Sequence, residues 1–174
     1  MSRIRLFCAF AMAALFVTPA AHAQYQPPKP GPEHAILKQL EGTWDTTMKM
    51  AGMESKGSAT YKMDLGGLWL TSKFEGDMGG EKFSGRGFDT YDADKKKFVG
   101  VWFDSMSTKP MMLEGTYDKA KKTMTMFGDA PGMDGKMTKH KIVTEMPDDN
   151  TMNFAMYVGE VKEPAFTILY KRKK

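Results

Sequence analysis

The chain has 174 residues, a formal net charge of +4 and a single cysteine, Cys8. This length suits one domain with a sizeable core. A lone cysteine excludes an intrachain disulfide and a cysteine-based zinc site. The modest charge argues against nucleic acid as a partner.

The first 23 residues contain the three parts of a signal peptide. Arg3 and Arg5 make the start basic, residues 6–17 are apolar, and residues 21–23 (Ala-His-Ala) form a small-x-small cleavage site. The apolar part is too short to cross a bilayer, and no later segment approaches the ~20 apolar residues of a membrane-spanning helix. We therefore expect cleavage after residue 23, export to the periplasm or the medium, and no integral membrane segment afterwards. Cleavage would also remove Cys8.

Residues 24–32 are rich in proline, and we expect them to form an extended tether. The following residues, 33–40, have the pattern of a short helix, with Pro32 and Glu33 at its start. Ile36, Leu37 and Leu40 share one face of this helix, so that face should cover something apolar. We assign residues 33–174 to a single β-barrel domain.

From Gly42 onward, short alternating runs are interrupted by Gly, Asp, Asn or Pro about every ten residues, which is typical of an all-β sandwich or barrel. Short turns indicate up-and-down order, and closure would remove two unpaired edges. We predict an all-β, up-and-down antiparallel, lipocalin-like β-barrel of about ten strands. Glycines inside the strands (Gly85, Gly87 and Gly100) fit sharp bends in a closed wall. The predicted strands are 42–50, 57–64, 68–75, 81–91, 97–104, 111–117, 123–127, 136–145, 151–158 and 165–171.

The segment Leu40-Glu41-Gly42-Thr43-Trp44, after a short helix, resembles the opening of calycin-type barrels, and Tyr170-Lys171-Arg172 resembles their closing strand. In lipocalin-like proteins the tryptophan of such a segment lies across the barrel floor, beneath a basic residue of the last strand. The resemblance implies that Trp44 packs against Lys171 or Arg172 in a cation–π contact. This role is structural.

Several further segments together resemble the exported bacterial family called domain of unknown function 1579. The resemblance implies the barrel fold and a single domain but no activity. The abundance of methionine departs from what the family implies. The segments are Pro32-Glu33-His34 through Gly42-Thr43-Trp44, Gly87-Phe88-Asp89-Thr90-Tyr91-Asp92, Trp102-Phe103-Asp104-Ser105, Leu113-Glu114-Gly115-Thr116-Tyr117-Asp118 and Tyr170-Lys171-Arg172-Lys173.

Of the 17 methionines, only Met1 and Met12 lie in the leader, and several others share a strand face at a period of two. We favour their use as flexible filler for a core or for an adaptable pocket wall. The alternative is a thioether site for Cu(I) or Ag(I), because soft sulfur ligands select such ions. The one local grouping suited to a metal comprises Met133, Met137 and His140.

We expect no cofactor. After the leader the chain has two histidines, His34 and His140, too few for a histidine-based metal site in one chain. Haem would require His140 to point inward as an iron ligand, and we expect a surface or hydrogen-bonded histidine there instead. The chain has no Gly-x-Ser-x-Gly, His-Glu-x-x-His or phosphate-loop motif. Most of its candidate acids lie at predicted strand ends and turns, where carboxylates are usually solvated; they are Asp89, Asp92, Asp104 and Glu114.

Arg86 is the best candidate for a cation inside the barrel, where its planar fork would bind a carboxylate, although we favour an outward position. If the hairpin closes on residues 93–96, Arg86 faces Phe103, whereas a one-residue slip would set it beside Trp102.

Together these features favour a non-enzymatic barrel that binds a small apolar or amphipathic ligand. The alternatives are the Cu(I) or Ag(I) protein and a protein-interaction module. The candidate ligand-lining residues are Trp69, Arg86, Trp102, Phe103, Met124, Met126 and Tyr157.

Overall fold

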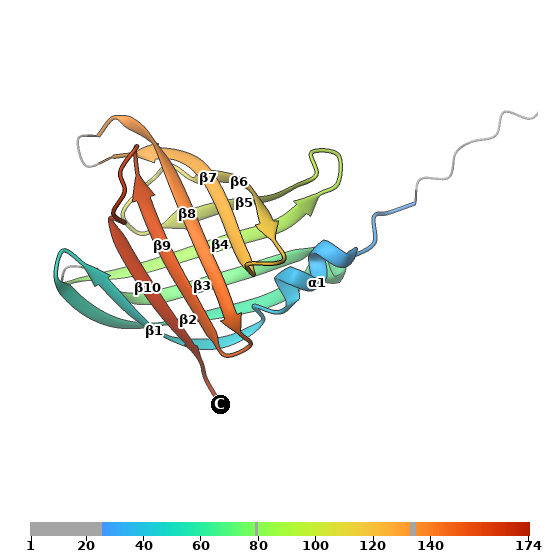
Figure 1. Ribbon diagram of the computed structural model, residues 1–174, viewed down its shortest axis with the longest axis horizontal. Coiled ribbons are helices and arrows are strands. Elements are labelled where there is room, and N and C mark those ends of the chain that lie inside the picture. Colours follow the sequence, from blue (N-terminus) through green and yellow to red (C-terminus); the bar gives the residue numbers. More distant parts are fainter. Residues whose placement is uncertain (1–25, 79, 133–134) are drawn as a thin grey trace, which may run out of the picture.

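The computed structural model describes residues 26–78, 80–132 and 135–174, so the proposed leader lies outside the described part. Ten antiparallel strands form a closed barrel in up-and-down order, with one short helix before the first strand (Figure 1). The predicted fold class is therefore confirmed. The elements are α1 (Pro32–Lys38), β1 (Gly42–Met50), β2 (Met53–Asp64), the 3-10 turn η1 (Leu65–Gly67), β3 (Trp69–Met78), β4 (Glu81–Asp92), β5 (Lys97–Asp104), β6 (Met111–Asp118), β7 (Thr123–Pro131), β8 (Met137–Asp148), β9 (Thr151–Val158) and β10 (Phe166–Arg172).

The barrel closes where β1 pairs with β10, from Trp44 opposite Arg172 to Met50 opposite Phe166. Each other strand pairs with its neighbours in the sequence. Side chains alternate between the two faces of a strand, so every strand sends about half of its residues into the interior. In β1 the inward positions include Trp44 and Met48, both nearly fully buried.

Turn chemistry explains where the strands begin and end. Ala51 and Gly52 both adopt positive φ (49° and 81°), so a two-residue turn joins β1 to β2. Pairing therefore starts at Met53, four residues earlier than the sequence predicted. In the β4–β5 turn the Asp92 carboxylate accepts two backbone N–H groups, at 2.9 and 3.0 Å. The Asp118 carboxylate does the same in the β6–β7 turn.

The helix α1 covers one end of the barrel, beside β2, β3 and β4 (Figure 1). Its Ile36 and Leu37 are buried, as the apolar face predicted. The His34 imidazole accepts the Gly31 N–H at Nδ1, 3.0 Å away, and its Nε2 lies 3.5 Å from Thr90 Oγ1. These contacts fasten the start of the helix to β4. Within the described ranges, no helix has the length and apolar character needed to cross a membrane.

Candidate functional site

A cavity of about 510 Å³ occupies the barrel interior. Ile36, Leu37 and Leu40 of the helix segment line it at one end. The other end is bordered by the loop between β5 and β6, which contributes Met106 and Lys109. The helix therefore closes the floor, and the hairpin loops at the opposite end surround the mouth.

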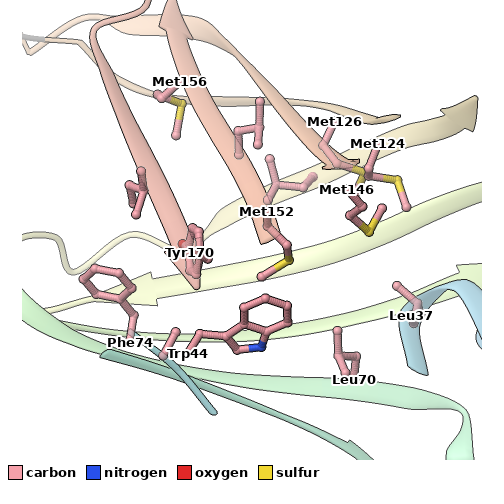
Figure 2. Packing of buried hydrophobic residues seen from close by; sticks show 14 of the residues in the cluster. Leu37, Trp44, Leu70, Phe74, Met124, Met126, Met146, Met152, Met156 and Tyr170 are labelled. Atoms are coloured by element: carbon pink, nitrogen blue, oxygen red, sulfur yellow. The ribbon is translucent and has the colours of Figure 1, made fainter. Parts of the chain in front are cut away.

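Methionine dominates the cavity wall. Figure 2 shows several of these side chains, from β7, β8 and β9, in the same interior as Trp44 and Leu70. Unbranched thioether side chains adapt their shape to an occupant more readily than branched ones. The nine described methionines that line the cavity are Met48, Met78, Met106, Met111, Met124, Met126, Met146, Met152 and Met156.

The carboxylate of Asp89 on β4 lies within this apolar wall toward the helix-covered end. It pairs across the strands with Leu70 on β3 and Gly100 on β5. Burial raises the pKa of Asp89 to about 7. Among the described residues, no hydrogen bond or ion pair reaches the carboxylate, and burial is the only cause of the shift. Asp89 is half-buried, and its carboxyl group faces the cavity without a partner in the described part of the chain. An ionisable group set in an apolar wall in this way is costly for folding, which makes this position a candidate for ligand contact.

Two tyrosines lie close together inside the barrel, and one of them, Tyr61, is near enough to Asp89 to sense its charge. The rings of Tyr61 on β2 and Tyr170 on β10 are 6.4 Å apart between centroids. Burial raises the pKa of Tyr61 to about 12, hydrogen bonding with Tyr170 opposes this rise, and the charge of Asp89 adds to it. Burial likewise raises the pKa of Tyr170. Both phenols therefore stay protonated at neutral pH and add polar groups to the cavity wall.

Glycines provide the room for the polar and aromatic groups of the wall. A Cβ atom on Gly100 would lie 2.2 Å from Oδ1 of Asp89. A Cβ on Gly85 would lie 2.0 Å from the Trp102 ring, and one on Gly87 would lie 3.2 Å from it. The missing side chains of these glycines thus leave space for Asp89 and Trp102. Their role in sharp bends of the wall stays a prediction.

Three of the predicted lining residues line the cavity: Trp102, Met124 and Met126. The Trp102 indole also donates to Asp104 Oδ2, 3.1 Å away, at the mouth. Asp104 therefore already accepts a hydrogen bond within the protein. The interpretation of Asp89 as a solvated acid at a strand end was wrong. β4 extends past Asp89 to Asp92, so position 89 lies within the strand and its side chain faces inward.

The other four predicted lining residues do not line the cavity, because alternation places them on the outer face. Arg86 is half-exposed, donates to the Gly85 carbonyl and lies 3.9 Å from Glu75. It pairs with Phe103, as expected for a hairpin that closes on residues 93–96. Phe103 is itself exposed, Trp69 neighbours the inward Leu70, and Tyr157 packs under Lys141 on the outside.

The two described members of the predicted metal grouping, Met137 and His140, lie on opposite faces of β8. Met137 is exposed on the outer face of β8, whereas His140 is buried and lines the cavity. The Nδ1–H of His140 donates to the Thr138 carbonyl at 2.8 Å. Met133 lies outside the described residues.

Sequence reasoning missed Asp89, Tyr61 and Tyr170 as cavity groups. A signal was present, since Asp89 shares a strand face with Gly85 and Gly87. A run of two glycines and an acid along one strand face looks solvent-exposed when it is judged by hydrophobicity alone.

Comparison with known proteins agrees with the fold. No curated protein matches the chain. The chain is similar to Rv2717c from M. tuberculosis, with 14% identity and a TM-score of 0.59, over 83% of this chain and 99% of that one. It is also similar to a redesigned β-barrel, mFAP1, bound to DFHBI, with 15% identity and a TM-score of 0.45, over 79% of this chain and 98% of that one. The model of the family described as protein of unknown function (DUF1579) matches residues 29–172. Because this match covers most of the chain, the protein belongs to the DUF1579 family.

Proposed function

We propose that the barrel binds a small apolar or amphipathic molecule in its interior without converting it chemically. The observation that carries this proposal is the cavity of about 510 Å³ inside the barrel wall. Pockets for small molecules usually measure ~300–1,000 Å³, with mostly apolar walls and a few placed polar groups. Asp89, Tyr61 and Tyr170 are such polar groups in a wall formed mainly by methionine, leucine and aromatic residues.

The direct test is native mass spectrometry of the protein purified from its own host. A bound molecule of organic mass that is lost on denaturation supports the proposal. Binding is then measured with Nile red as a fluorescent neutral probe and n-decanol as its competitor. Failure of both compounds to bind, together with a clean unliganded mass, contradicts the proposal.

Neighbouring residues on opposite faces of β5 provide a matched pair of variants. Trp102 lines the cavity, whereas Phe103 lies outside it. We expect Trp102→Ala to weaken n-decanol binding at least fivefold, because it removes a large apolar contact surface. Phe103→Ala should leave affinity within twofold. Equal effects of the two variants would show that the probe binds elsewhere.

A second candidate is binding of Cu(I) or Ag(I), favoured by the number of thioethers that face one cavity. Met124, Met126 and Met146 come from the adjacent strands β7 and β8 and appear together in Figure 2. Silver titration followed by native mass spectrometry tests this candidate. Replacement of all three by leucine should abolish a stoichiometric Ag(I) adduct, whereas leucine at the exposed Met53 and Met112 should not.

Export through a cleaved leader is a separate part of the proposal. It is supported by the basic, apolar and small-x-small parts of residues 1–23. Intact-mass measurement of the protein from its own host should give a chain that begins at Gln24. A mass that includes residues 1–23 would contradict cleavage.

A further inference from the structure

Among the described residues of the cavity wall, Asp89 is an acid without a hydrogen-bond or ion-pair partner, and its chemistry indicates the type of ligand. We propose that the barrel selects apolar ligands that bear a protonated amine, and that the Asp89 carboxylate receives the ammonium group. This inference rests on the proposed function of the cavity and specifies its substrate class.

The first argument is the missing partner of Asp89. Among the described residues that line the cavity, Asp89 and Asp104 are the two acids. Asp104 accepts the Trp102 indole N–H at 3.1 Å and the Met106 backbone N–H at 2.9 Å. Asp89 accepts no hydrogen bond from the described part of the chain. Charges inside proteins are normally paired, so a cationic ligand would supply the positively charged partner that the Asp89 carboxylate lacks.

The second argument is the placement of the basic residues. Lys73 borders the cavity, but its ammonium lies 2.6 Å from Glu75, where both side chains are half-exposed. Arg86 lies on the outer face beside the same glutamate. Lys109 belongs to the loop at the mouth. A ligand carboxylate near the floor would therefore meet the charge of Asp89 without a neighbouring cation, which disfavours fatty-acid-like anions.

The third argument is that the fold makes space for this carboxylate. Gly100 lies opposite Asp89, and a Cβ there would lie 2.2 Å from Asp89 Oδ1. Trp102 occupies the adjacent inward position of β5, opposite Gly87. An ammonium at Asp89 would thus lie close to an indole ring, whose face attracts cations. The phenol oxygens of Tyr61 and Tyr170 are further acceptors in the same interior.

Other titratable groups around Asp89 do not supply a positive charge at neutral pH. Tyr61 on β2 and Tyr170 on β10 are neutral phenols with raised pKa values. β4 itself adds Tyr91, and β5 adds Asp104 at the mouth. The cavity-facing residues of the helix segment are all apolar, namely Ile36, Leu37 and Leu40.

His140 on β8 also lines the described part of the wall, and its Nδ1–H donates a hydrogen bond to the Thr138 carbonyl. Burial raises the pKa of Asp89 to about 7, so the carboxyl is partly protonated at neutral pH in the empty barrel. A bound ammonium would favour its ionised form. Amine binding should therefore strengthen as the pH rises through 7.

The experiment compares three probes of equal chain length, n-decylamine, n-decanol and n-decanoate, on the purified chain by isothermal titration calorimetry at pH 8.5. We expect decylamine to bind at least tenfold more tightly than decanol, and decanoate to bind more weakly than decanol. Asp89→Asn should remove the preference, so that the ratio of decylamine affinity to decanol affinity falls to about one. The matched control, Asp45→Asn, makes the same change on the exposed outer face and should keep the preference.

Equal affinities of decylamine and decanol for the wild type, or a preference that survives Asp89→Asn, would overturn the amine inference and leave the cavity function standing. Failure of all three probes would overturn both. The pH dependence of binding to the wild type tests the same role without any variant that could misfold. Between pH 8.5 and 5.5 the preference for decylamine over decanol should fall at least fivefold. An unchanged preference would contradict the role of Asp89.

Discussion

The guanidinium of Arg172 lies 4.1 Å from the ring centroid of Trp44, at the point where the last strand meets the first. The same guanidinium group donates to three backbone carbonyls, those of Gln39, Glu41 and Asp149. One side chain thus ties β10 to the link between α1 and β1 and to the β8–β9 turn. Of the two basic residues that the calycin resemblance offered, Arg172 makes this contact, whereas Lys171 donates to Thr151.

Replacement of Arg172 by lysine should destabilise the protein. A lysine has one charged nitrogen and cannot reproduce the planar fork that contacts three carbonyls and the Trp44 face. Loss of two hydrogen bonds and of part of the cation–π contact should lower the free energy of unfolding by about 2–3 kcal/mol. Urea denaturation measures this change. Lys173→Ala removes an exposed ion pair with Asp45 and should cost less than about 0.5 kcal/mol.

Gly85→Ala should displace the Trp102 indole. A Cβ at position 85 would lie 2.0 Å from the ring, so either the ring or β4 must shift. Overpacking of this kind costs ~1–3 kcal/mol. We expect a fall in thermal stability together with a changed tryptophan emission spectrum. Ser84→Ala, at the neighbouring position on the other face of β4, should change neither property, and a spectral change there would argue against this geometry.

The stability of the protein should depend on pH through Asp89. Its pKa is about 7 in the folded protein, against about 3.9 in an unfolded chain. Between these values the folded state holds a proton that the unfolded state releases, so stability falls as the pH rises from about 4 through 7. Asp89→Asn removes this pH-dependent loss of stability, because asparagine does not ionise. At pH 8.5 the variant should therefore exceed the wild type by on the order of 2–4 kcal/mol.

Urea denaturation of both proteins at pH 4.5 and 8.5 checks this prediction. The stability difference between variant and wild type should be small at pH 4.5 and large at pH 8.5. A difference that is constant across this range would contradict the burial of an ionised Asp89.

The β6–β7 turn contains a residue in an unfavourable backbone conformation. Lys122 has φ of 49°, a region that glycine occupies without steric cost. Lys122→Gly should raise the free energy of unfolding by about 0.5–1 kcal/mol, as measured by urea denaturation. Lys121→Gly, at the neighbouring position with no positive φ, should lower it instead. Destabilisation by both substitutions would show that the Lys122 side chain contributes more than its backbone strain costs.

Local patterns in the sequence were sufficient for the order of the strands and for many of their bounds. The predicted bounds of the first strand agree with β1, and the expected closure of the hairpin on residues 93–96 agrees with the pairing of Arg86 and Phe103. Both follow from short-range chemistry, since alternation and turn residues act within a few positions. The start of β7 agrees with the predicted residue 123, but its end does not, because pairing with β8 carries the strand on to Pro131.

The sequence by itself thus determined the element order, the up-and-down barrel and the apolar face of the N-terminal helix. Only the tertiary structure decided which face of each strand points inward. On β4 the outward face carries Arg86 and Phe88, whereas the inward face carries Gly85, Gly87 and Asp89. The physical reason is that Trp102 and the Asp89 carboxylate need the space that glycines on the adjacent strand leave open, a requirement set by pairing across the barrel wall.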